Sequence, residues 1–553
     1  MKNLNVFLKC NLLFVLISLY GCSCQRNLSY ISYKSGKKKI KLTENEYKNW
    51  QHKDIQLDTI PGISLDRAYS EILRGKKGKE VVVAVIDTKL DIHHDELKDN
   101  IWTNKKEIPS NGIDDDKNGY IDDINGWNFL GTLQGKDILY QNSEITRIVR
   151  AYKDKYENKD KNGLSEKQLE EYKMYKRVRG IYYSEAKKAK ANMKYFDSIS
   201  IVYVKAKQEL KERFNKEKYM PDELDSIQKL NPELEGMIKV LKYAQRNNFT
   251  EDKFKRYYKY YKNLITYGYN VSYNEREGLN ENSEDIEDSI YGNNIVFGDV
   301  PFQHSTSVSG LLAASRANNL EVKGVSDNIK ILPVVMVATG DEYDKDVALA
   351  IRYAVDNGAK IINMSWGKRF SLHSDWVIDA VKYAKENDVL LIHGAGNEAT
   401  NTDEEDFYPI DNVAGKEFVD NFIVVGASSY SLDKNLIARF SNYGKENVDV
   451  FAPGNYLYTT DVNNKFKYNS GTSLATPLVS GVAGLIFSYY PDLTSAEVKN
   501  IILNSGVEYS IMVKVPREKG KEMPFNQMSK SGKIINAFNA LKLAGEVSKK
   551  KRH

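Results

Sequence analysis

The chain has 553 residues, 41% of them hydrophobic and 28% charged, so it is long enough for one large domain or several with a packed core. Its formal net charge of +5 is small for this length and gives no argument for nucleic-acid binding. All three cysteines, Cys10, Cys22 and Cys24, lie near the N-terminus, so no disulfide between them can link the main body of the chain.

The N-terminus has the pattern of an export signal. Two lysines precede an apolar run over residues 12–19, which is too short for a comfortable transmembrane helix. The run ends in Leu19-Tyr20-Gly21-Cys22, which resembles a bacterial lipobox. We therefore expect a signal peptide over residues 1–21, lipidation of Cys22, and a membrane-anchored protein of the cell envelope, at the outer membrane or the surface. Because Tyr20 is bulkier than usual, a secreted chain and a retained anchor are the alternatives.

The polar, lysine-rich residues 22–45 are predicted to be a tether. From there, β-branched runs alternate with helical patterns, which favours an α/β fold with a doubly wound, mostly parallel sheet. The predicted strands are 80–87, 329–337, 360–365, 389–393 and 422–427, and the predicted helices between them are 346–357 and 375–387. We expect this domain to be discontinuous, over residues 46–130 and 290–545.

Residues 131–289 differ in composition, with many Lys, Glu and Tyr and few Pro and Gly. A capping box at Ser165 predicts a long helix to about Phe214, and residues 252–264 predict another. We interpret this segment as a helical insertion with a solvated surface rather than a specific charged partner site. A helix over 496–504 capped by Thr494, a last helix over 534–544 and a solvated basic tail over 546–553 complete the chain.

Three polar side chains lie at strand ends or helix starts. Asp87 ends the first strand, His304 opens a small-residue helix, and Ser473 opens the apolar helix pattern that continues to Ile486. The N–H groups of a helix start favour negative charge on a nearby oxygen, and Pro477 is expected in the first turn, where its missing N–H costs little. Taken alone, the serine is equally compatible with an ordinary buried helix.

Together the three residues have the chemistry of nucleophilic catalysis. A hydroxyl becomes a nucleophile when an imidazole takes its proton and a carboxylate holds that imidazole in the right tautomer. The motif Gly471-Thr472-Ser473-Leu474-Ala475-Thr476-Pro477 and the chain order Asp, His, Ser resemble the subtilases, a family of subtilisin-like serine endopeptidases. The resemblance covers roughly 46–130 and 290–545, and implies hydrolysis of protein or peptide substrates by Asp87, His304 and Ser473.

The resemblance also implies a site for the oxyanion and for the substrate. Asn397 matches the asparagine whose amide stabilises the tetrahedral oxyanion in this family. Two segments are expected to line the pocket for the residue before the scissile bond and to pair with an extended substrate: Ser365, Trp366 and Gly367, and Gly394, Ala395 and Gly396.

Three positions depart from the family motifs. Lys89 stands in place of a glycine after the aspartate, Ser305 in place of a glycine after the histidine, and Ser307 in place of a second histidine. Because glycine allows close approach of the backbone, replacing it by Lys89 and Ser305 is expected to narrow the cleft or alter a turn. The alternative to an active protease is therefore a catalytically weak or inactive binding protein with the same fold.

An acidic loop follows the first strand. Asp114, Asp116 and Asn118 alternate like the first ligands of a calcium loop, and the carbonyl of Tyr120 is a further candidate. Asn125 takes the place of the closing glutamate, so Asp122 or Asp123 is expected to complete the shell. The prediction is a structural Ca²⁺ site; the alternative is a solvated acidic turn.

Overall fold

The computed structural model describes residues 32–33, 42–298, 304–318 and 320–552; the predicted signal peptide and Cys22 lie outside them. A ten-stranded sheet forms the centre of this part of the chain, in the order β1-β13-β16-β10-β9-β6-β5-β2-β4-β3. Its strands are β1 (Ser32–Tyr33), β2 (Val81–Asp87), β3 (Trp127–Asn128), β4 (Ile329–Val335), β5 (Ile361–Met364), β6 (Leu390–Gly394), β9 (Phe422–Ser428), β10 (Val450–Pro453), β13 (Val507–Tyr509) and β16 (Lys533–Ile534). Only β13 and β16 pair antiparallel within it, which confirms the predicted α/β class with a mostly parallel sheet.

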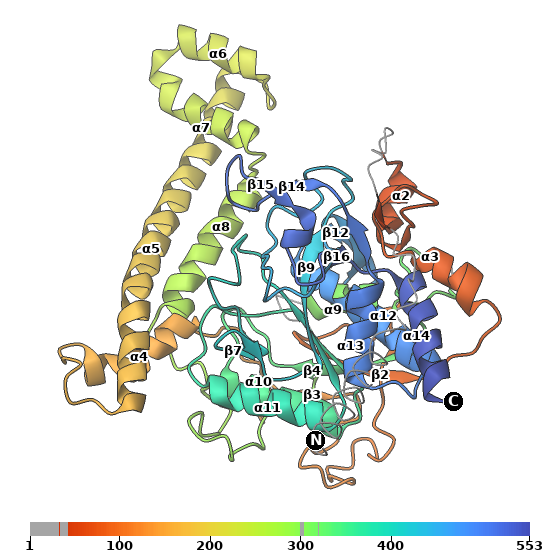
Figure 1. Ribbon diagram of the computed structural model, residues 1–553. Helices are drawn as coiled ribbons and strands as arrows, with labels where there is room; N and C mark the ends of the chain where they lie inside the picture. Colours follow the sequence, from red (N-terminus) through yellow and green to blue (C-terminus); the bar gives the residue numbers. More distant parts are fainter. Residues whose placement is uncertain (1–31, 34–41, 299–303, 319, 553) are drawn as a thin grey trace, which may run out of the picture.

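Helices cover both faces of the sheet, and successive residues of β2 show why. Val83 and Val85 pack into one hydrophobic cluster with the helices that begin at His304 and Thr472, whereas Ala84 and Ile86 pack into a second cluster with the helices that begin at Asp344 and Ser374. The helices of this domain are α9 (His304–Ala313), α10 (Asp344–Asp356), α11 (Ser374–Glu386), α12 (Thr472–Tyr489), α13 (Ser495–Ser505) and α14 (Ala537–Lys551) (Figure 1). In the sheet, β2 lies between β4 and β5, so the strand order reverses at β2. In parallel sheets, ligand-binding and catalytic sites lie at the carboxyl ends of the strands next to such a reversal.

The buried helix α12 differs from the prediction at Pro477. The helix begins at Thr472, so Pro477 lies in the second turn rather than the first. A proline there has no N–H to donate to the carbonyl of Ser473, four residues earlier. The hydroxyl of Ser365 donates to that carbonyl instead, at 2.9 Å. By length and composition α12 would also suffice to cross a membrane, but 89% of it is buried in the core.

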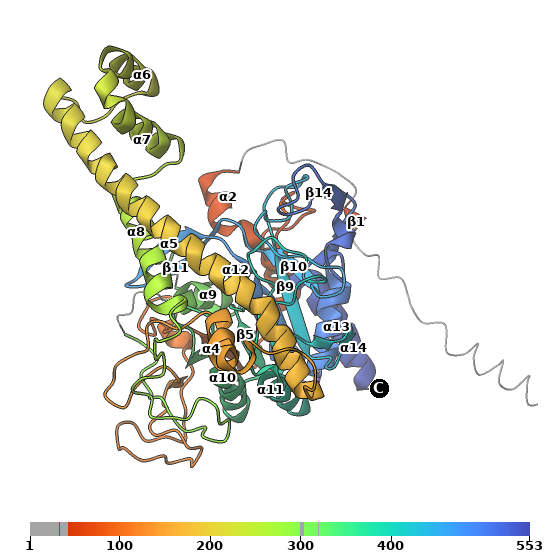
Figure 2. The ribbon, with the colours of Figure 1, turned by 90° about the vertical axis from the view of Figure 1, so that its left-hand side faces the viewer.

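The helices between Glu144 and Asn263 form an arm beside the sheet (Figures 1 and 2). They are α4 (Glu144–Tyr156), α5 (Glu166–Phe214), α6 (Pro221–Leu230), α7 (Glu235–Arg246) and α8 (Glu251–Asn263). The capping box predicted at Ser165 is present and opens α5. The base of the arm packs through Ile148 and Val178 against Phe370 of the main body, and the rest has small hydrophobic clusters of its own.

Both ends of the domain correct the sequence analysis. Within the predicted tether, β1 pairs with β13 and a capping box at Thr43 opens α2 (Glu44–Asn49). At the other end, Ile534 belongs to β16, and α14 continues to Lys551. Lys551 is not simply solvated, because its ammonium contacts the carboxylate of Glu497 at 2.8 Å. These contacts join residues far apart in the sequence, so no local pattern predicts them.

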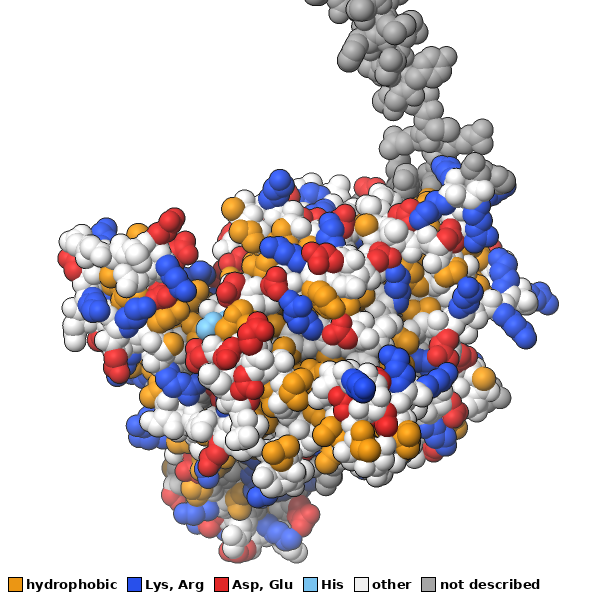
Figure 3. Space-filling model, turned by 90° about the horizontal axis from the view of Figure 1, so that it is seen from below, with side chains coloured by type: hydrophobic (Ala, Val, Ile, Leu, Met, Phe, Trp, Pro, Cys, Tyr) orange, Lys and Arg blue, Asp and Glu red, His pale blue; other side chains and the backbone are white. Residues whose placement is uncertain are grey.

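Short hairpins and a mixed-charge surface complete the domain. The hairpins are β7 (Asn412–Val413) with β8 (Lys416–Glu417), β11 (Leu457–Asp461) with β12 (Lys465–Asn469), and β14 (Met512–Lys514) with β15 (Glu522–Pro524). On the face in Figure 3, Lys and Arg side chains are interspersed with Asp and Glu, as the small net charge leads one to expect.

Candidate active site

Asp87, His304 and Ser473 meet at the carboxyl edge of the sheet. Asp87 is the last residue of β2, His304 the first of α9, and Ser473 lies in the first turn of α12. The imidazole Nδ1 of His304 lies 2.9 Å from Oδ2 and 3.1 Å from Oδ1 of Asp87, and its Nε2 lies 3.0 Å from the hydroxyl of Ser473. The chain of contacts runs from carboxylate to imidazole to hydroxyl, as general-base activation of a serine requires.

The carboxylate sets the electrostatics of this group. Asp87 is completely buried and His304 largely so. Burial disfavours the charged imidazolium, but the charge of Asp87 and its hydrogen bond favour it more, so the pKa of His304 lies above its ordinary value of 6.5. An imidazole with a raised pKa is a stronger base toward the hydroxyl of Ser473.

Asn397 lies beside the serine, just after β6. Its side-chain oxygen accepts hydrogen bonds from the backbone N–H of Thr472 at 2.9 Å and from the hydroxyl of Thr472 at 3.2 Å. Because the oxygen is held in this way, the amide N–H₂ is the end of this exposed side chain that can donate hydrogen bonds to a substrate oxygen. Gly471 keeps this corner open, because a Cβ there would lie 2.8 Å from the hydroxyl oxygen of Ser473.

A cavity of about 240 Å³ opens next to these groups. Of the residues predicted to bind substrate, Ser365, Trp366, Gly367, Gly394 and Gly396 line it, together with His304, Asn397 and Ser473. Ala395 is not among the lining residues and packs in the core instead. The sequence analysis missed Val337, Ala338, Gly340, Glu342, Glu398, Phe407 and Thr472, which also line the cavity. Glu398 directly follows Asn397 and Thr472 lies within the serine motif; the others carry no signal in sequence.

The three unusual residues do not fill this cavity. The ammonium of Lys89 points to Asp137 instead, at 2.8 Å from its carboxylate. Ser305 and Ser307 are buried in α9, and the hydroxyl of Ser307 donates to the carbonyl of Thr460 at 2.9 Å. The expected narrowing of the cleft by these side chains is therefore wrong for this cavity.

The acidic loop brings together a different set of carboxylates from the one expected. Glu107, Asp114 and Asp116 offer oxygens that all lie within 4.8 Å of one another. Asp122 instead accepts backbone N–H groups of Asn111 and Gly112 at 3.2 and 2.9 Å. Glu107 is missing from the sequence analysis because it precedes the loop and fits no ligand spacing.

Asp123 is likewise used inside the protein. Its buried carboxylate accepts hydrogen bonds from Tyr353 at 2.6 Å, Asn104 at 2.8 Å and Asn118 at 3.1 Å. Burial raises its pKa to about 6 despite these bonds. The ring of Tyr120 packs against Trp127, and its backbone N–H donates to the side chain of Asn118 at 2.8 Å. Asp122 and Asp123 thus brace the loop. Glu107, Asp114 and Asp116 also accept backbone N–H groups of the loop, and their oxygens form its acidic cluster.

Residues 78–526 match the subtilase family, so the chain belongs to this family of serine proteases. It is 35% identical over 208 residues to a cell wall-associated protease of Bacillus subtilis (strain 168), covering 37% of this chain and 21% of that one. It is 37% identical over 186 residues to a thermophilic serine proteinase of Bacillus sp. (strain AK1), covering 34% and 42%. With thermitase of Thermoactinomyces vulgaris it shares 36% over 186 residues, covering 34% and 61%. The matches thus span less than two thirds of these relatives.

Among solved structures, the chain is similar to the prenylagaramide maturation protease PagA. The TM-score is 0.36 and the identity 27%, over 44% of this chain and 82% of that one.

Proposed function

We propose that the chain is a serine endopeptidase that cleaves peptide bonds through an acyl-enzyme. The observation that carries this proposal is the hydrogen-bonded chain from Asp87 through His304 to Ser473, at the edge of a cavity open to substrate. Membership of the subtilase family supports the same reaction class.

In the proposed mechanism, His304 Nε2 takes the proton of Ser473 as the serine oxygen attacks the substrate carbonyl. Asp87 accepts a hydrogen bond from the Nδ1–H of His304, which leaves Nε2 unprotonated to act as the base. The amide of Asn397 and the backbone N–H of Ser473, at the start of α12, stabilise the oxyanion. His304 then returns its proton to the leaving amine, and water hydrolyses the acyl-enzyme in the same way.

A fluorophosphonate probe tests this proposal directly. The serine oxygen attacks the phosphorus and expels fluoride, so we expect covalent labelling of Ser473 in the wild type and none in Ser473→Ala, measured by intact mass and peptide mapping. Heat-denatured protein provides the control for non-specific labelling. A folded wild-type chain that does not label in the presence of calcium would instead support an inactive binding protein.

We also propose that Glu107, Asp114 and Asp116 bind a structural Ca²⁺ ion. Three carboxylates whose oxygens lie within 4.8 Å of one another fit a hard divalent cation, which would offset their mutual repulsion. We expect calcium to raise the melting temperature, because an ion that binds only the folded state at about 100 times its Kd stabilises it by about 2.7 kcal/mol. Calcium titration during thermal melting measures this.

Glu107→Gln should reduce the calcium-dependent shift, whereas Glu386→Gln, an exposed change at the end of α11, should keep it. A wild-type midpoint that is the same in calcium and in excess chelator would remove the proposed ion.

A further inference from the structure

The cavity beside Ser473 has an acidic lining. Among the described residues that line it, the ionisable ones besides His304 are Glu342 and Glu398, and none is Lys or Arg. Glu398 is exposed, and its carboxylate already accepts a hydrogen bond from Asn442 at 2.8 Å. Glu342 is different, because only 5% of it is exposed.

The carboxylate of Glu342 lacks a hydrogen-bond partner for one oxygen. Within the described part of the chain, its Oε2 is buried and accepts no hydrogen bond. A buried carboxylate without such a bond is unfavourable, because it loses the solvation that water gave it. Because this oxygen is closed off from solvent, a cationic group of a ligand in the cavity becomes its partner when the Glu342 side chain turns its carboxylate toward the cavity.

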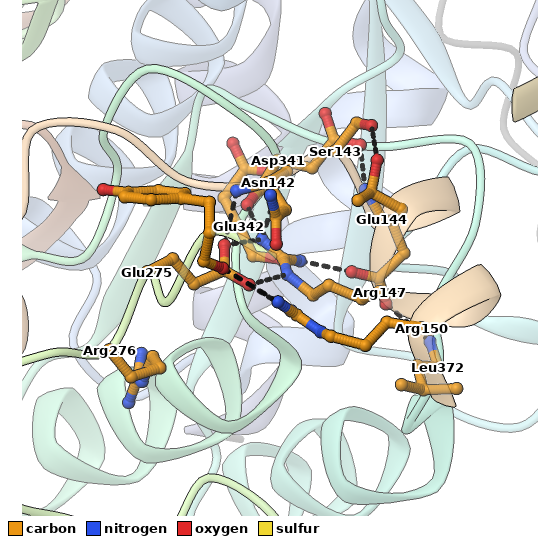
Figure 4. A network of polar contacts seen from close by, with 12 residues as sticks. Asn142, Ser143, Glu144, Arg147, Arg150, Glu275, Arg276, Asp341, Glu342 and Leu372 are labelled. Carbon is orange, nitrogen blue, oxygen red and sulfur yellow. Dashed lines mark hydrogen bonds and ion pairs between the residues drawn. The ribbon is translucent and has the colours of Figure 1, made fainter. Parts of the chain in front are cut away.

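The cations near Glu342 are engaged elsewhere. The ammonium of Lys368 and the guanidinium of Arg147 donate to the backbone carbonyl of Glu342, at 2.6 and 3.0 Å. Lys368 also pairs with Asp344 at 2.8 Å and with Glu144 at 3.2 Å. Figure 4 shows Arg147 next to Glu144 and Glu342. The two cations therefore hold the backbone that carries Glu342 and face other carboxylates.

The backbone around Thr339 fixes the orientation of the segment that carries Glu342. The N–H of Thr339 donates to the carbonyl of Leu139 at 3.1 Å, and its carbonyl accepts from the N–H of Gln141 at 2.8 Å. In an extended chain, the N–H and carbonyl groups of successive residues point to opposite sides. Those of the residues next to Thr339 therefore point away from the 139–141 segment. Ala338 and Gly340, on either side of Thr339, line the cavity, as does the segment that contains Ser365. A substrate between these two segments would run past Glu342.

We propose that Glu342 is a specificity-determining residue that pairs with a cationic side chain, Lys or Arg, of a substrate residue before the scissile bond. The assignment rests on the proposed protease function, because it concerns the same cavity. The ammonium or guanidinium donates to the buried carboxylate and neutralises the acidic lining of the cavity.

The ionisation of Glu342 gives this preference a pH dependence. Burial and then the charge of Asp341 raise its pKa to about 7, and the opposing charges of Lys368 and Arg147 offset this only in part. A cationic substrate binds the ionised form, so selection of basic over neutral residues should strengthen as the pH rises through about 7. His304 also titrates in this cavity, but its effect cancels in the ratio of two substrates.

The experiment compares matched peptides that differ at one of the four positions before the scissile bond. Each position carries Lys or norleucine, and Arg or citrulline, and kcat/KM is measured from pH 5.5 to 8.5. At one position we expect the wild type to prefer the cation by about 10- to 100-fold, the range of a charge-assisted hydrogen bond. Glu342→Gln should lose this ratio and its pH dependence while it still labels with the fluorophosphonate.

Two variants serve as controls. Glu386→Gln, outside the cavity, should keep the wild-type ratio, and Glu398→Gln should change it less than Glu342→Gln because its carboxylate is exposed and already bonded. A wild type that labels and cleaves without preferring cations would overturn the assignment of Glu342. So would a preference that survives Glu342→Gln or disappears in Glu398→Gln alone. A wild type that does not label would contradict the protease function itself.

Discussion

Replacing Asp87 with asparagine should lower kcat by about 10⁴-fold while leaving the fold intact. The buried carboxylate accepts a hydrogen bond from the Nδ1–H of His304, with 2.9 Å between Nδ1 and Oδ2, and so leaves Nε2 free to receive the proton of Ser473. An asparagine of the same shape can donate its amide N–H to Nδ1, which favours the tautomer with the proton on Nε2. That tautomer cannot act as the base.

The pH profile gives a second readout of Asp87→Asn. Activity needs neutral His304, so kcat/KM of the wild type should rise with pH through a value above 6.5, because Asp87 raises the pKa of that ring. In the variant, burial still opposes the imidazolium but the opposite charge is gone. The remaining activity should therefore rise at a lower pH than in the wild type.

Steady-state kinetics normalised by active-site titration measures both effects of Asp87→Asn. Asp99→Asn, the same change at an exposed position, is the matched control and should keep the wild-type rate. A kcat of Asp87→Asn within tenfold of the wild type would show that His304 does not depend on this carboxylate.

The central sheet and the three catalytic candidates could be predicted from the sequence, because the strands and the site motifs are local patterns. Buried β-branched runs identify β2, β5, β6 and β9, and parallel strands place their carboxyl ends at one edge. The small-residue motif around Ser473 identifies the start of α12. Proximity of these segments then follows from the fold class.

Contacts between distant segments could not be predicted in this way. The sequence analysis predicted that Lys89 would narrow the cleft. It could not identify the ion-pair partner of Lys89, because Asp137 is 48 residues away and belongs to no motif. Glu107 comes close to Asp114 and Asp116, and Glu342 comes to line the cavity beside Ser473, only when the chain has folded. The place of Pro477 depends on where α12 begins, and helix boundaries are set by tertiary contacts as well as by propensity.

Arg147→Met should destabilise the protein by about 3–5 kcal/mol, as expected when one partner of a buried charge network is removed. Arg147 is only 3% exposed and lies in α4, at the base of the arm. Its guanidinium donates to Glu275 at 3.1 Å, to Glu144, and to backbone carbonyls that include that of Glu342 at 3.0 Å (Figure 4). Methionine has similar length but leaves these buried acceptors unpaired.

This loss of stability should become smaller at acid pH. Burial raises the pKa of Glu275, but the charge and hydrogen bonds of Arg147 outweigh it, so the pKa lies below the ordinary value of 4.5. Its contribution to stability is thus present above that value and lost as the pH falls through the folded-state pKa. Without Arg147, burial raises the pKa of Glu275, and protonation then relieves the unpaired charge. Urea unfolding at pH 7 and pH 4.5 measures the difference.

Arg150→Met provides the matched comparison, because Arg150 contacts the same carboxylate of Glu275 at 2.9 Å but is 35% exposed. A partly exposed pair of this kind should contribute about 1 kcal/mol or less. Equal losses for the two variants would mean that the charge on Glu275, rather than the buried position of Arg147, determines stability. A much larger loss for Arg147→Met would show that the arm is held by its buried guanidinium, which also supports the backbone of Glu342 at the cavity that Ser473 lines.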